Sequence, residues 1–173
     1  MRVVLYLLLV LSSLVMGGKL MKVESPSFKN GEVIPQKYTC DGENVSPPIA
    51  WSGFPEGTKS FVLIVDDPDA PIGTFTHWVV YDIPANTVSL KENFPKSKQV
   101  DNIKQGINDF GRVGYGGPCP PPGHGYHRYF FKVYALNVES LGLPPGATKE
   151  QVESRMKSHI LSEGQMMGRY RRD

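Results

Sequence analysis

The stretch GYGGPCPPPGHGYHRYFFKVYAL spans residues 114–136 and changes character near its middle. Residues 114–126 are drawn only from glycine, proline, cysteine, tyrosine and histidine. After His127, bulky apolar side chains alternate with other residues, which is the pattern of a β-strand. The stretch therefore predicts a stiff, turn-rich loop that leads directly into a strand over Arg128–Leu136.

Other segments of the chain show the same strand character. Ser60–Val65 (SFVLIV) and His77–Ile83 (HWVVYDI) are rich in β-branched and aromatic residues, which favour strands. Weaker strand candidates are Lys22–Phe28 and Ile49–Phe54. The 18 glycines and 15 prolines are spread along the chain and predict many short connections.

One helix is predicted over residues 147–161 (ATKEQVESRMKSHIL). Thr148 stands where an N-cap is expected, and Gln151 completes a capping box. The apolar stripe of this helix consists of Val152, Met156 and Ile160. Gly164 is expected to end the helix. The predicted fold class is therefore mainly β with minor α, a helix packing on the sheet late in the chain.

The N-terminal residues 1–18 look like a secretory signal peptide. Arg2 precedes an apolar run over 3–15 that is too short to span a membrane, and small residues follow it. The alternative is an uncleaved N-terminal anchor. We expect the protein to be exported, secreted or extracytoplasmic, and residues 19–173 to form a single domain.

Charge and cysteine content limit the classes of partner. The net charge is +2, without the clustered basic face that nucleic-acid binding requires. Cys40 and Cys119 are the 2 cysteines, and an oxidising compartment would allow a disulfide between them. Spacing alone does not establish that bond. Neither cysteine lies in a Cys-x-x-Cys pair, so no structural zinc site is expected.

Three polar residues stand at predicted strand ends beside proline- or glycine-rich loops. Asp67 stands at the end of the strand Ser60–Val65, on the same face as Leu63 and Val65, whereas Asp66 points the other way. His77 and His127 each begin a strand. A carboxylate and two histidines at strand ends form a better candidate site than any one of them alone.

These residue types leave three chemistries open. Aspartate and histidine can bind a metal, histidine oriented by aspartate can act as a base in hydrolysis, and histidine with backbone N–H groups can capture an anion. The sequence contains no G-x-S-x-G, H-E-x-x-H or G-x-x-x-x-G-K motif. No nucleophile is identified, which weakens the enzyme interpretation.

Four motifs together resemble the phosphatidylethanolamine-binding protein family. They are YTCDGENVSPPIAW at 38–51, DDPDAP at 66–71, THWVVYDIP at 76–84 and GPCPPPGHGYHRYFFKVYAL at 117–136. The first is similar to a motif of the prokaryotic branch, often called Raf kinase inhibitor-like proteins. The resemblance extends from about Phe28 to Gly168.

The resemblance implies a central antiparallel β-sheet flanked by a smaller sheet and short helices. It also implies a small anion pocket formed by Asp67, His77, His127 and Tyr129. The residues implied for its rim are Gly116, Gly117, Pro118, Pro120 and His124. A further hypothesis is that a Cys40–Cys119 bridge ties the CDG segment to this rim.

The family is generally regarded as non-catalytic, so we expect a binding protein for a small anionic or phosphorylated ligand, with no cofactor. An extracytoplasmic serine-protease inhibitor is the alternative, and a phosphoester hydrolase the third. Membrane contact is expected only through an uncleaved leader or lipid headgroups. The motif THW has one histidine where many animal members have two. Export argues against regulation of a cytosolic kinase.

Overall fold

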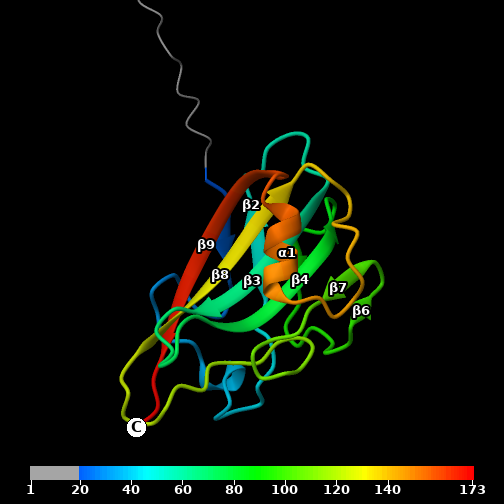
Figure 1. The fold of residues 1–173 in the computed structure, drawn as a ribbon. Coiled ribbons are helices and arrows are strands. Elements are labelled where there is room, and N and C mark those ends of the chain that lie inside the picture. Colours follow the sequence, from blue (N-terminus) through cyan, green and yellow to red (C-terminus); the bar gives the residue numbers. More distant parts are fainter. Residues whose placement is uncertain (1–19) are drawn as a thin grey trace, which may run out of the picture.

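The structure is a computed structural model that describes residues 20–173. The leader predicted at residues 1–18 lies outside the described residues. Two antiparallel sheets form most of the fold, and a short helix lies across one face of the larger sheet (Figure 1). The mainly β prediction is therefore confirmed.

The larger sheet has six strands in the order β6-β7-β4-β3-β8-β9, and every neighbouring pair is antiparallel. Its strands are β3 (Ser60–Asp67), β4 (Phe75–Pro84), β6 (Gln99–Val100), β7 (Ile103–Gln105), β8 (His127–Leu136) and β9 (Ile160–Tyr170). The strands predicted at Ser60–Val65, His77–Ile83 and Arg128–Leu136 thus correspond to β3, β4 and β8. These three strands lie next to one another in the middle of the sheet.

The smaller sheet has the order β1-β2-β5 and is also antiparallel. Its strands are β1 (Lys22–Glu24), β2 (Ile49–Ser52) and β5 (Ser89–Leu90), and a 3-10 helix, η1 (Gln36–Tyr38), lies between β1 and β2. The two weaker strand candidates correspond to β1 and β2, and both strands are shorter than predicted.

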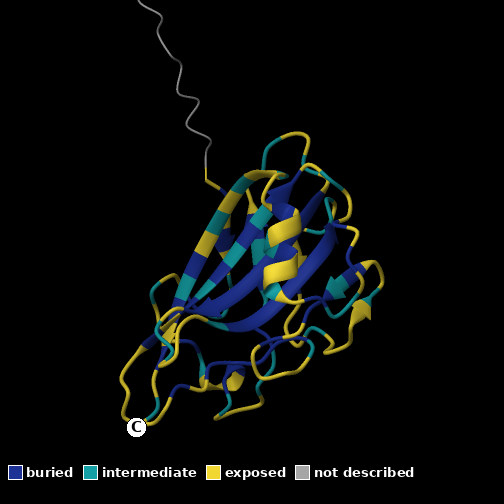
Figure 2. Cartoon of the chain, viewed as in Figure 1, coloured by how far each residue is buried: buried dark blue, intermediate teal, exposed yellow. Residues whose placement is uncertain are grey.

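Strand β3 is buried along its whole length because both faces of the larger sheet are covered there (Figure 2). Phe61, Leu63 and Val65 pack in one hydrophobic cluster with Trp51 of the smaller sheet. Val62 and Ile64 pack in a second cluster, under the helix. Because one strand serves two cores, its ends are held firmly in place.

The helix prediction is right at its start and wrong at its end. Helix α1 spans Lys149–Met156, and the Thr148–Gln151 capping box is present. Ile160, predicted to lie on the helical stripe, instead begins β9, and Gly164 lies inside that strand. Pairing of β9 along the whole of β8 replaces the last helical turn. Gly164 is needed there because a Cβ atom would lie 2.1 Å from the Met21 carbonyl oxygen.

Within residues 20–173, no helix is long and apolar enough to cross a membrane.

Candidate functional site

Antiparallel pairing brings the predicted site residues to one end of the larger sheet. Strand β3 ends at Asp67 where β8 begins at His127, and His77 lies near the start of β4 on the other side of β3. These residues line a cavity of about 340 Å³. The lining comprises Asp67, Ala70, Pro71, Ile72, Phe75, His77, Phe110, Cys119, Pro120, Pro121, His127 and Tyr129. We call it the histidine pocket.

Asp67 and His127 form a buried pair on its floor. The His127 Nδ1 lies 2.7 Å from Asp67 Oδ2, and both side chains are at most 4% exposed. The other carboxylate oxygen, Oδ1, accepts a hydrogen bond from the backbone N–H of Asp69 at 2.7 Å. With both oxygens engaged, Asp67 orients His127 and does not need to touch a ligand. Asp66 points to the opposite face, as predicted, toward Lys132 and Lys149.

His124, predicted at the rim of the pocket, is exposed and contacts His127 directly. Its Nδ1 is 2.6 Å from the Nε2 of His127, so one proton must lie between the two rings. Asp67, His127 and His124 thus form one hydrogen-bonded chain. In this arrangement the nitrogen through which His127 would meet a ligand is already occupied.

His77 is buried and neutral. Its Nδ1 lies 2.7 Å from the carbonyl oxygen of Gly116, which can only accept, so Nδ1 carries the proton. Burial lowers the pKa of His77, and the hydrogen bond to Gly116 and the charge of Asp67 offset this only in part. The remaining nitrogen, Nε2, is therefore an acceptor. Phe75, Phe110 and Tyr129 hold the ring by edge and tilted contacts at 5.0–5.4 Å.

Tyr129 supplies a neutral hydroxyl. Burial raises its pKa, and the charges of Asp67 and Asp69 raise it further, so the phenol keeps its proton. Within residues 20–173, this hydroxyl has no hydrogen-bond partner. It is a free donor at the cavity.

The predicted rim residues form a wall between the histidine pocket and its surroundings. Gly116 donates its N–H to the His77 carbonyl oxygen, and Gly117 donates its N–H to Asn44 Oδ1 at 2.8 Å. A Cβ atom on Gly117 would lie 2.2 Å from the Tyr38 carbonyl oxygen, which explains the glycine. Pro118 is buried, whereas Pro120 lines the pocket.

A disulfide ties this wall to the segment that follows η1. The sulfur atoms of Cys40 and Cys119 are 2.10 Å apart. The Cys40 N–H also donates to the Pro118 carbonyl oxygen at 3.0 Å, and the Tyr115 hydroxyl donates to the Tyr38 carbonyl oxygen at 2.7 Å. The disulfide hypothesis made from the sequence thus agrees with the structure.

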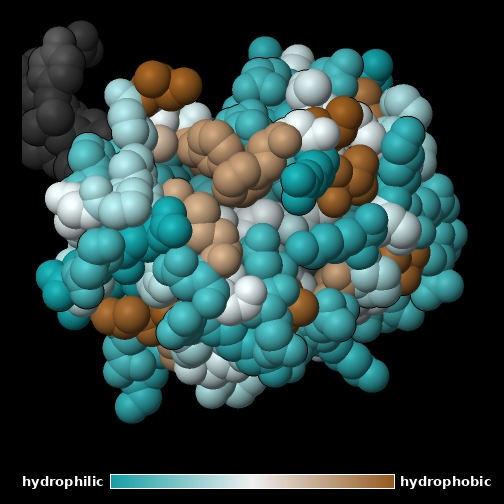
Figure 3. All heavy atoms as spheres, turned by 90° about the horizontal axis from the view of Figure 1, so that it is seen from below, coloured by the Kyte–Doolittle hydropathy of each residue, from teal (hydrophilic) through white to brown (hydrophobic). Residues whose placement is uncertain are grey.

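The mouth of the histidine pocket is apolar, and no lysine or arginine is among the described residues that line the pocket. Ile72 is 98% exposed and Phe110 is 44% exposed. Figure 3 shows this end of the molecule, where apolar side chains gather among hydrophilic ones. The Arg128 guanidinium, next in sequence to His127, is paired with Asp69 through two hydrogen bonds of 2.9 Å. Polar recognition in the pocket therefore depends on His127, His77 and Tyr129.

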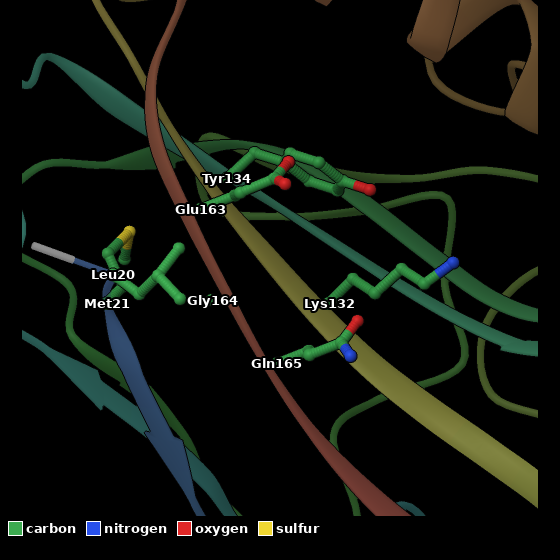
Figure 4. A pocket seen from close by; sticks show the side chains of 7 residues that line it. All are labelled: Leu20, Met21, Lys132, Tyr134, Glu163, Gly164 and Gln165. Atoms are coloured by element: carbon green, nitrogen blue, oxygen red, sulfur yellow. The ribbon is translucent and has the colours of Figure 1, made fainter. Parts of the chain in front are cut away.

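A separate cavity of about 440 Å³ is lined by residues of β8 and β9 and by Leu20 and Met21 near the start of the described chain. Figure 4 shows Lys132 and Gln165 on one side of it, and Leu20 and Met21 on the other. Lys132 is engaged with Asp66 at 3.1 Å. None of the predicted site residues lines this cavity, so we do not assign the function to it.

Sequence reasoning missed the aromatic walls of the pocket. Phe75 lies two residues before His77, on the same face of β4, so strand alternation could have found it. Phe110 comes from a distant loop and carries no such signal.

Two antiparallel sheets with a small pocket at the ends of the central strands define the class of protein, and comparison with known proteins agrees. The family described as phosphatidylethanolamine-binding protein matches residues 24–171. The chain belongs to this family. The resemblance inferred from the four motifs is therefore confirmed.

Bacterial and archaeal members of the family are particularly similar to this chain. A UPF0098 protein of Aquifex aeolicus is 69% identical over 157 residues, covering 91% of this chain and 92% of that protein. A UPF0098 protein of Pyrococcus abyssi is 51% identical over 159 residues, covering 90% and 88%.

Two solved structures share the fold at useful identity. Escherichia coli YbcL, described as a new member of the mammalian PEBP family, has a TM-score of 0.83 at 35% identity, covering 90% of this chain and 100% of that chain. A PEBP homologue of Chlamydia trachomatis has a TM-score of 0.80 at 40% identity, covering 89% and 99%. A carboxypeptidase Y inhibitor, solved with its cognate proteinase, has a TM-score of 0.50 at 17% identity, covering 90% and 84%, and shows likeness of fold alone.

Proposed function

We propose that this protein binds a small anionic or phosphorylated ligand in the histidine pocket and carries out no reaction on it. The observation that carries the proposal is the meeting of His127, His77 and Tyr129 at one apolar-walled cavity. Few, well-placed polar groups in an apolar cavity are typical of a small-ligand site.

Each polar group has a distinct role in this proposal. In this proposal His127 donates to the ligand in its protonated form, while its Nδ1 stays hydrogen-bonded to Asp67. The Tyr129 hydroxyl is a second donor. Neutral His77 can only accept through Nε2, so it fits the hydroxyl of a singly protonated phosphoryl group. For His127 to reach the ligand, His124 must first turn away from it.

The test is a titration with inorganic phosphate from pH 8 to pH 6 at constant ionic strength. Binding should strengthen as the pH falls, because a protonated histidine gives a charge-assisted hydrogen bond. Phosphate itself titrates in this range, so His127→Gln serves as the reference. Equal pH dependence in the two proteins would contradict the proposal.

The hydrolase alternative can be tested on the same material. Turnover of a phosphomonoester that disappears in His127→Ala would replace the binding proposal with an enzymatic one. Cys119 lies in the pocket wall, but its sulfur is bonded to Cys40 and is not available as a nucleophile.

Serine-protease inhibition has weaker support. The likeness to the carboxypeptidase Y inhibitor is one of fold alone, and no feature of the pocket favours a protease. We therefore place ligand binding first. Assays against chymotrypsin-like and elastase-like proteases would separate the two functions.

We also propose that the protein acts outside the cytoplasm. The proposal is supported by the leader-like sequence at 1–18 and by the Cys40–Cys119 disulfide. N-terminal sequencing of the protein from fractionated cells tests it: a chain that retains residues 1–18 in the soluble cytoplasmic fraction would overturn it.

A further inference from the structure

A second cavity lies on the other side of the wall that bounds the histidine pocket. Its volume is about 330 Å³, and it shares only Phe110 and Cys119 with the histidine pocket. Its lining comprises Cys40, Asn44, Lys96, Asn108, Phe110, Arg112, Val113, Tyr115, Gly116, Gly117 and Cys119. We call it the cation cavity, because Lys96 and Arg112 line it and no carboxylate does.

The two cations lack counter-ions. Within the part of the chain that the structure describes, neither Lys96 nor Arg112 forms an ion pair. The one bond from the Lys96 Nζ goes to a neutral acceptor, the Asn44 carbonyl oxygen at 2.9 Å. The Arg112 guanidinium has no hydrogen-bond partner among residues 20–173.

The two charges also repel each other. Burial lowers the pKa of Lys96, and the nearby charge of Arg112 lowers it further. The neutral polar side chains of the cavity are used internally. Asn44 accepts from Gly117, and Asn108 donates to the Gly114 carbonyl oxygen at 2.9 Å. Lys96 and Arg112 are thus the charged groups that can meet a ligand.

We propose that the cation cavity is a second anion site, which binds the phosphoryl group of a small soluble phosphomonoester between Lys96 and Arg112. Arginine offers a planar fork that matches two oxygens of a phosphoryl group, and lysine adds a compact charge. The cavity is larger than a phosphate ion requires, and its Phe110, Val113 and Tyr115 wall can take a small organic group. The site does not depend on the function proposed for the histidine pocket.

The probe is inorganic phosphate, added at constant ionic strength to the full protein and followed by NMR at the Arg112 Nε–H and the Val113 amide. Saturable shifts are expected at both signals. Lys96→Gln or Arg112→Gln should weaken binding by about tenfold or more, because each removes a charge-assisted hydrogen bond. Bound phosphate should also raise the pKa of Lys96, since it supplies the missing counter-ion.

Lys98→Gln is the matched control. Lys98 is exposed, lies two residues from Lys96 and does not line the cavity, so the variant loses the same charge. Its affinity at the Arg112 signal should stay within about twofold of the wild type, as should that of His127→Gln. The retained amide spectrum of each variant shows that it is folded.

Several outcomes would overturn the proposal. Shifts that do not saturate, or equal weakening in Lys98→Gln and Lys96→Gln, would mean attraction by net charge alone. Chemical-shift changes confined to residues of the histidine pocket would contradict binding in the cation cavity and remain consistent with binding in the histidine pocket. Cosedimentation with phosphatidylcholine vesicles containing phosphatidic acid, sensitive to Lys96→Gln, together with no effect of inorganic phosphate, would replace the soluble ligand with a lipid headgroup.

Discussion

The histidine pocket and the cation cavity share a wall but use their charged groups in opposite ways. In the histidine pocket, Asp67 and His127 are buried and bonded to each other. In the cation cavity, Lys96 and Arg112 lie at the surface and have no carboxylate partner among residues 20–173. Paired groups hold the structure together, whereas unpaired groups are available to a ligand. A cavity's charge count alone therefore does not tell whether its residues serve stability or binding.

The largest expected effect comes from the shared wall. The disulfide joins residues separated by 79 positions, and such a long closed loop is expected to contribute about 4 kcal/mol to the free energy of unfolding. Cys40→Ser/Cys119→Ser should lose about this amount in guanidinium denaturation and should weaken phosphate binding in both cavities. A loss below about 1 kcal/mol would mean that hydrogen bonds such as Cys40–Pro118 are sufficient to hold the wall.

The second prediction compares the stability of the two charge arrangements directly. Asp67→Ala leaves His127 unpaired and the Asp69 N–H without its acceptor. The variant should therefore lower the free energy of unfolding by about 3 kcal/mol. The double variant Lys96→Gln/Arg112→Gln breaks no ion pair and relieves a repulsion between two positive charges. Its free energy of unfolding should therefore differ from that of the wild type by less than about 0.5 kcal/mol. Equal losses in the two variants would end the distinction between paired and unpaired charges.

Part of this comparison could be predicted from the sequence. Strands β3 and β4 carry continuous apolar runs and β8 carries an alternating pattern, and alternation along β3 is sufficient to separate Asp67 from Asp66. The start of strand β9 was missed because Ile160 continues the helical spacing of Val152 and Met156, and only its pairing with β8 shows that it begins a strand. The cation cavity was missed because Lys96 and Arg112 are brought together by the tertiary fold.

The third prediction concerns His124, whose contact with His127 the sequence did not reveal. His124→Ala removes the group that occupies His127 Nε2, so phosphate should bind the histidine pocket about 2–10-fold more tightly. Isothermal titration calorimetry at pH 6 measures this. The same variant should leave the shift of the Arg112 Nε–H unchanged. Weaker binding in His124→Ala would make His124 a part of the ligand site.

The smallest expected effect is the pH dependence of stability at His77. Burial holds its folded pKa below the usual value of about 6.5, so below that pH the unfolded chain takes up a proton that the folded chain does not. The contribution of neutral His77 is therefore fully present above about pH 6.5 and is lost as the pH falls. This one residue can change the free energy of unfolding by at most about 1.4 kcal/mol per pH unit.

His77→Gln isolates this contribution, because a glutamine amide can still donate to the Gly116 carbonyl oxygen but does not titrate. Denaturant unfolding at pH 7.5, 6.5 and 5.5 should show a shallower loss of stability in the variant than in the wild type. Equal slopes would mean that His77 takes up a proton in the folded protein as readily as in the unfolded chain. It would then be a donor to the ligand, and the histidine pocket would carry a positive charge of its own, as the cation cavity does.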